Sequence, residues 1–145
     1  MDNRDLIEVL RQNSSSFRSA PAVSGADLRA LAIYHPGLPD EYVQFLKWSN
    51  GGELVAADQA VDLWDSATVV ERNERLNVAS RLPGHVLIGS NEGELAIAFA
   101  CSSGFCRVVG VPFGDLSPDS VVELDHLLSK FVARVLAGEV DMEAL

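Results

Sequence analysis

The chain of 145 residues is predicted to fold as a single α+β domain, in which helices pack on an antiparallel β-sheet. Two observations predict this class. Three apolar runs of strand length follow one another between residues 85 and 113, with turn-forming residues between them, which favours consecutive antiparallel hairpins. Amphipathic runs with helical spacing lie before and after these strands. We therefore expect N-terminal helices, a central meander and a long C-terminal helix.

Three helices are expected in the N-terminal third. Apolar residues share one helical face from Asp5 to Gln12 and again from Ala26 to Ile33, where His35-Pro36-Gly37 ends the pattern. Between Pro39 and Ser49 the proline suits a first helical position, and Asn50-Gly51-Gly52 supplies left-handed residues for the helix end. The third helix is expected to pack its apolar side on the sheet, including Tyr42, Phe45 and Leu46.

The middle of the chain alternates between strand and helix signals. A short strand is expected at Val61 to Trp64, then a helix from Ala67 to Arg81. Both faces of the meander are apolar, so we expect cover on both sides. The expected strands are His85 to Ser90, Glu94 to Ala100 and Phe105 to Phe113.

The register of the meander follows if both of its loops contain two residues. Ile88 then lies opposite Ile97, and Phe99 lies opposite both Val86 and Val108. The last element is expected to be a helix that begins at Ser117-Pro118-Asp119 and continues to Gly138.

The same register places Cys101 opposite Cys106, where Cα atoms of a non-hydrogen-bonded pair lie about 4.5 Å apart. A cross-strand disulfide is therefore possible, but the core does not require one. Two cysteines without nearby histidines favour structural thiols over redox or metal roles, and they agree with a reducing compartment.

Composition excludes several classes of function. With 21 acidic and 11 basic residues the formal charge is −10, which disfavours binding to nucleic acid or to anionic membranes. The N-terminus lacks the pattern of an export signal, and no apolar run approaches the length of a membrane span, so we expect a cytoplasmic protein. No glycine-rich phosphate loop is present, and we expect no cofactor and no metal.

Candidate residues for chemistry are sparse. His35, His85 and His126 are far apart in sequence, and each is interpreted first as a surface or capping residue, with a hydrolase that uses one of them as the least favoured hypothesis. Between Glu53 and Asp65 lie four acids and no base, with Trp64 among them, which is typical of a protein-binding surface. The candidate contact residues are Asp62, Trp64, Asp65, Glu92 and Glu94; the alternative is a buried Trp64 with solvated acids around it.

A resemblance to a known family spans roughly residues 26 to 136. Leu38-Pro39-Asp40-Glu41-Tyr42-Val43-Gln44-Phe45-Leu46, ending in Ser49-Asn50-Gly51-Gly52, resembles the signature helix of the SUKH superfamily, the Smi/Knr-like proteins. The order of later features is also similar: Leu63-Trp64, then Leu87-Ile88-Gly89-Ser90-Asn91, then a hairpin and a closing helix. One departure is Phe99-Ala100, where the family often has an acidic residue closing the strand.

This resemblance implies a domain with residues 1–24 as an N-terminal helix and loop and residues 25–137 as the family-like core. It also implies a non-enzymatic binding protein, in bacteria commonly an immunity protein that neutralises a toxin by binding it. A toxin of the nuclease type would offer a basic cleft. The alternative is an intracellular regulatory or scaffolding domain, like the fungal relatives that regulate cell-wall assembly. The matching motif residues are expected to be structural: Pro39, Tyr42, Phe45, Leu46, Asn50, Gly51, Gly52 and Gly89.

Overall fold

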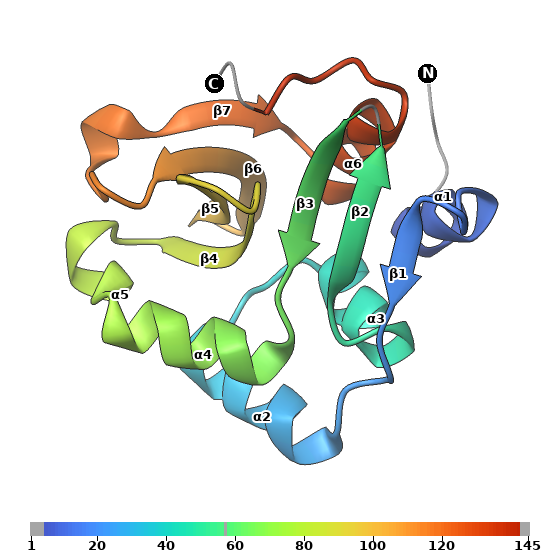
Figure 1. Cartoon of the computed structure of the whole chain (residues 1–145). Coiled ribbons are helices and arrows are strands. Elements are labelled where there is room, and N and C mark those ends of the chain that lie inside the picture. The colour runs from blue at the N-terminus through green and yellow to red at the C-terminus, as the bar shows by residue number, and fades with distance from the viewer. Residues whose placement is uncertain (1–4, 57, 143–145) are drawn as a thin grey trace.

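The computed structural model describes residues 5–56 and 58–142, and within them the chain folds as an α+β domain (Figure 1). One seven-stranded antiparallel sheet has its strands in chain order, from β1 to β7. The strands are β1 (Phe17–Ser19), β2 (Gly52–Ala56), β3 (Gln59–Leu63), β4 (His85–Ser90), β5 (Leu95–Ser102), β6 (Phe105–Pro112) and β7 (Val122–Asp125). The helices are α1 (Leu6–Gln12), α2 (Gly25–Tyr34), α3 (Asp40–Trp48), α4 (Ser66–Arg75), α5 (Val78–Arg81) and α6 (Leu128–Leu136), with a 3-10 turn η1 at Pro118–Ser120.

Helices cover the sheet from two directions. Helix α6 contacts β2, β6 and β7 and packs with α1 and α3, whereas α4 and α5 contact β4 and α2 packs on α4. In Figure 1, α4 and α2 lie below β4, and α6 lies behind β2 and β3. The middle strands are consequently buried on both faces, as their apolar pattern predicted.

The three N-terminal helices confirm the sequence prediction with one adjustment. Pro39 has φ −57° and ψ 139°, so it lies just before α3 rather than at its first helical position. The expected helix from Ala67 to Arg81 is divided, because Asn77 adopts a left-handed conformation (φ 59°) between α4 and α5. Asparagine tolerates this conformation better than most residues do, so it can separate two helices without glycine.

The predicted register of the meander is correct between β5 and β6 and for the first residues of β4, and it is wrong for the later residues of β4. Phe99 lies opposite both Val86 and Val108, as expected. Ile88 does not lie opposite Ile97, because a bulge between Leu87 and Gly89 brings Gly89 to that place. The loop between β4 and β5 is longer than the two residues assumed, whereas the β5–β6 turn has two residues with positive φ, Ser103 and Gly104.

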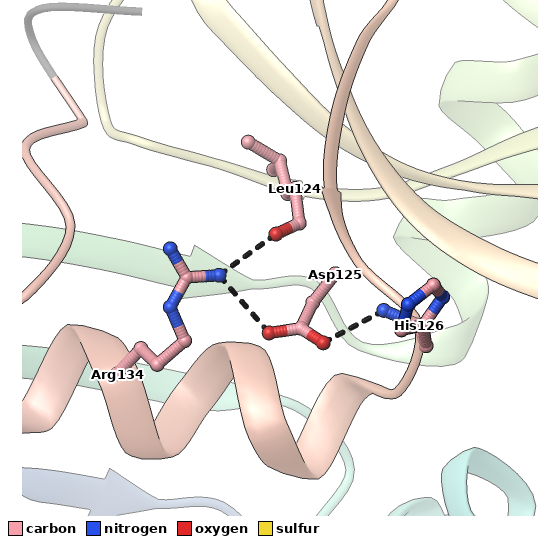
Figure 2. Close-up of polar contacts among 4 residues, drawn as sticks. All are labelled: Leu124, Asp125, His126 and Arg134. Atoms are coloured by element: carbon pink, nitrogen blue, oxygen red, sulfur yellow. Dashed lines mark hydrogen bonds and ion pairs between the residues drawn. The ribbon is translucent and has the colours of Figure 1, made fainter.

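The expected C-terminal helix is confirmed, but it is shorter than predicted, because only Leu128–Leu136 of the range from Ser117 to Gly138 is helical. The segment forms η1, then the edge strand β7, and only then the nine-residue α6. Two adjacent valines at 121 and 122 favour an extended chain, and β7 satisfies the open edge of β6. Arg134 fixes the two elements together, because its Nη1 donates to Leu124 O at 2.9 Å and to Asp125 Oδ2 at 3.0 Å (Figure 2).

Cys101 and Cys106 form a disulfide across β5 and β6, with their Cα atoms 4.0 Å apart. The predicted pairing is confirmed, but the interpretation as structural thiols is wrong. The disulfide also removes the argument from cysteine usage for a reducing compartment.

Candidate protein-binding surface

One face of β1, β2 and β3 is left open. The paired Leu54 and Val61 point into the core and are fully buried, whereas the next pair along the same strands, Glu53 and Asp62, lies on the opposite face and is partly exposed. Among the described elements, no helix covers the near face of β2 and β3 in Figure 1. Side chains on this face are therefore available to a partner.

A row of residues crosses this open face. The strand register pairs Arg18 with Glu53, Glu53 with Asp62, and Asp62 with Ser90. Glu53 and Asp62 are thus two carboxylates directly opposite each other on neighbouring strands. Like charges in that arrangement destabilise a sheet.

Glu92 adds a third carboxylate from the loop between β4 and β5. Its backbone has a positive φ of 60°, and its N–H donates to Ser90 Oγ at 3.1 Å. The Glu92 carboxyl group shares a hydrogen bond with the Glu53 carboxyl group. That bond, with burial and the charges of Glu53 and Asp62, raises the pKa of Glu92 to about 7. We call Glu53, Asp62 and Glu92 the carboxylate cluster.

The neighbouring cations compensate the cluster only in part. Arg18 forms an ion pair with Glu53 at 3.5 Å, but its side chain is 83% exposed, so the pair is screened by water. Burial raises the pKa of Asp62, Arg72 opposes that shift, and Glu53 and Asp65 add to it. The net effect is a raised pKa for Asp62, with burial as its main cause.

Trp64, one of the candidate contact residues, is buried. Its side chain is only 3% exposed, stacks on Phe113 with ring centroids 6.2 Å apart, and has Arg72 above its ring at 4.5 Å. The structure therefore agrees with the alternative prediction, in which Trp64 is buried. Trp64 instead holds the Arg72 guanidinium in place by a cation–π contact.

The other acidic candidates have different positions. Asp65 is exposed and accepts a hydrogen bond from Thr68 N at 2.8 Å, so it caps α4 while its charge acts on Asp62. Glu94 is exposed on the same loop as Glu92, and its backbone carbonyl accepts from Phe113 N at 2.8 Å. Glu53 was counted in the acidic window of the sequence but not as a candidate, although pairing across a β2–β3 hairpin could have placed it beside Asp62.

The Asn-Gly-Gly motif after α3 joins three parts of the fold. Asn50 Oδ1 accepts from Ser66 N at the start of α4, and Asn50 N donates to Pro21 O, both at 2.9 Å. Gly51 has φ 85°, and a Cβ there would lie 2.4 Å from Leu63 O. The motif therefore ends the helix, as predicted, and also lets the start of α4 approach closely.

The remaining motif residues are structural in the same sense. Tyr42, Phe45 and Leu46 are fully buried, and the Tyr42 ring meets Phe99 edge-on at 5.2 Å. Burial, with the charge of Asp65, raises the pKa of the Tyr42 hydroxyl. A Cβ at Gly89 would lie 2.2 Å from the backbone oxygen of Asp62, so the close approach of β3 to β4 requires glycine there.

Two of the histidines, His85 and His126, lie beside polar groups of nearby residues. The His85 ring nitrogen Nδ1 lies 3.1 Å from Pro83 O, a backbone carbonyl. At His126 the backbone N–H, not the ring, donates to Asp125 Oδ1 (Figure 2). Within residues 5–56 and 58–142, no group of three or more His, Cys, Asp or Glu side chains is placed to hold a metal ion.

None of the helices described here is long and apolar enough to cross a membrane. No known protein-family model matches the chain, and no curated protein matches it.

Proposed function

We propose that this protein is a non-enzymatic binding module whose open β1–β3 face docks on a basic surface of a partner protein. One observation carries the proposal: the carboxylate cluster places three acidic side chains together on an uncovered sheet face. Their mutual repulsion destabilises the free protein. A lysine or arginine from a partner would relieve that repulsion on binding.

The charge of the whole chain acts in the same direction. A net charge of −10 attracts a basic partner over a distance, which raises the association rate at low salt. The cluster then supplies the local contacts that determine orientation. Added salt should therefore slow association more than it speeds dissociation.

The resemblance to the SUKH superfamily favours one class of partner. We propose an immunity-type function in the cytoplasm, in which the cognate partner is a toxin domain with a basic surface, for example the cleft of a nuclease. The alternative is a regulatory or scaffolding domain of the same fold that acts in cell-wall assembly and has a non-toxin partner. Both use protein binding rather than catalysis, and both would use the same face.

Co-expression with the product of the adjacent upstream gene tests the proposal. Rescue from that product's toxicity, together with a stable complex, is the expected result. A harmless neighbouring product would remove the immunity function and favour the regulatory alternative.

A matched pair of variants tests the binding face. The triple variant Glu53→Gln, Asp62→Asn, Glu92→Gln should lose rescue and weaken the complex at least tenfold, since each lost contact with a charged group contributes about 1.5 kcal/mol or more. The control Glu8→Gln, Asp27→Asn, Asp119→Asn neutralises three carboxyl groups in α1, α2 and η1. Equal weakening by both variants would show that net charge alone matters and would contradict the proposed face.

A further inference from the structure

A cavity of about 370 Å³ lies between α2, α3 and the loop that joins them. One wall is a single face of α2 with Leu28 and Leu31, continued by His35, the residue that follows the helix. Val43 of α3 and Leu38 of the loop complete the hollow. Its volume lies within the range of small-molecule sites, and its residues are distinct from the carboxylate cluster.

The cavity leaves apolar surface uncovered. The sequence places Leu28, Leu31 and Ala32 on one helical face, but of the three only Leu31 is buried in the core. Leu28, Leu38 and Val43 remain partly exposed along the cavity wall. An apolar group of a ligand would gain from covering them.

The charge of the cavity is opposite to that of the chain. Arg29 and Lys47 are both exposed lining residues, and among the described lining residues none is acidic. Neither cation makes an ion pair within the part of the chain that the structure describes. In a protein of net charge −10, two unpaired cations beside an apolar hollow point to an anionic ligand group.

His35 provides a third polar group at the same wall. Its ring nitrogen Nδ1 is shielded from solvent and has no hydrogen-bond partner among the described residues. Buried nitrogens of this kind are normally hydrogen-bonded in folded proteins. The described residues thus leave one polar atom of a lining residue without a partner.

We propose that this cavity binds a small carboxylate with an apolar body, such as a medium-chain fatty acid. The apolar chain covers Leu28, Leu38 and Val43, and the carboxylate pairs with Arg29 and Lys47 at the opening. This site is independent of the proposed protein-binding function, because the two use different residues and opposite charges.

A titration of the full chain with octanoate, below its micelle-forming concentration, tests the proposal by ¹H–¹⁵N NMR. Octanoate should shift the resonances of α2 and α3, hexanoate should bind about tenfold more weakly because two buried methylenes are lost, and acetate should not bind. Octanol, which has the chain without the carboxylate, should bind at least twofold more weakly than octanoate. Equal affinities for octanoate and octanol, or shifts confined to other elements, would overturn the proposal.

The two lysines of the sequence, Lys47 and Lys130, give a matched control. Lys47→Gln should weaken octanoate binding about two- to fivefold, and Lys130→Gln on α6 should leave it unchanged. Ala32→Trp, at an exposed position in the wall, should abolish binding without changing the melting temperature greatly. An equal effect of both lysine variants, or full binding by the tryptophan variant, would contradict the assigned site.

Discussion

Replacement of Asn73 by alanine should remove a large part of the stability of this fold. Asn73 is fully buried on α4. Its side-chain amide hydrogen-bonds both backbone groups of Leu87, as a neighbouring strand would do. Its Nδ2 donates to Leu87 O at 2.8 Å and to Val69 O at 2.7 Å, and its Oδ1 accepts from Leu87 N at 2.8 Å. These bonds connect α4 to β4 where the bulge interrupts the regular pairing.

The size of the effect follows from the backbone groups that lose their partner. Alanine leaves the N–H and C=O of Leu87 without the Asn73 amide, and each buried group without a partner costs about 1–3 kcal/mol. We expect a total loss of about 3–5 kcal/mol. Since domains of this size are stable by about 5–15 kcal/mol, the variant should be partly unfolded at moderate urea concentrations.

Urea unfolding followed by circular dichroism measures the free energy of unfolding for Asn73→Ala and for the control Asn13→Ala. Asn13 makes one part-buried bond to Val9 O, so its loss should cost about 1 kcal/mol. A loss below about 1 kcal/mol for Asn73→Ala would refute the role assigned to the side chain, because at least one orphaned backbone group must cost that much.

Three further predictions concern pH, the disulfide and the bulge. The pKa of Glu92 is about 7 in the folded state, above its ordinary value of 4.5. The free energy of unfolding should therefore fall as pH rises from 4.5 to 7. In thermal melts, the Glu92→Gln variant should show a smaller fall over the same range. The double variant Cys101→Ser, Cys106→Ser opens a short loop and should lose about 2 kcal/mol in urea unfolding; an unchanged midpoint would contradict this. Gly89→Ala should lower the free energy of unfolding by about 1–3 kcal/mol, because the new Cβ would clash with the β3 backbone. Gly114→Ala should lower it much less, because a Cβ there meets nothing within 4 Å.

Local sequence signals predicted the elements that depend on local chemistry. Caps, glycines and apolar spacing located the first three helices and the three central strands to within one or two residues. The α+β class followed from those elements. The pairing of Cys101 with Cys106 was also predictable, because a two-residue turn fixes its own register.

Elements that depend on distant contacts were harder to predict. Strand β1 has three residues and is defined by its pairing with β2, and β7 is defined by the edge of β6. At the bulge in β4, the backbone of Leu87 is hydrogen-bonded by Asn73, a residue of another element. Apolar spacing near residue 121 suited a helix equally well, so only the available sheet edge decided between the two structures.

The candidate surface also depends partly on local sequence and partly on distant contacts. The acidic window in the sequence contains Glu53 and Asp62 of the carboxylate cluster, but it could not show that Trp64 is buried. The contact between Glu53 and Glu92 requires the β4–β5 loop to fold over β2 and β3, which no local pattern encodes. The cavity between α2 and α3 was likewise invisible, since an apolar helix face does not reveal which of its residues the core leaves uncovered.

The protonation of Glu92 in the complex provides the most direct test of the proposed binding face. In the free protein a carboxyl NMR titration should give a pKa of about 7. With the co-expressed partner bound, a neighbouring lysine or arginine should lower that pKa below the ordinary 4.5. A Glu92 pKa that stays near 7 in a stable complex would show that the partner binds elsewhere, and the account of the carboxylate cluster would be wrong.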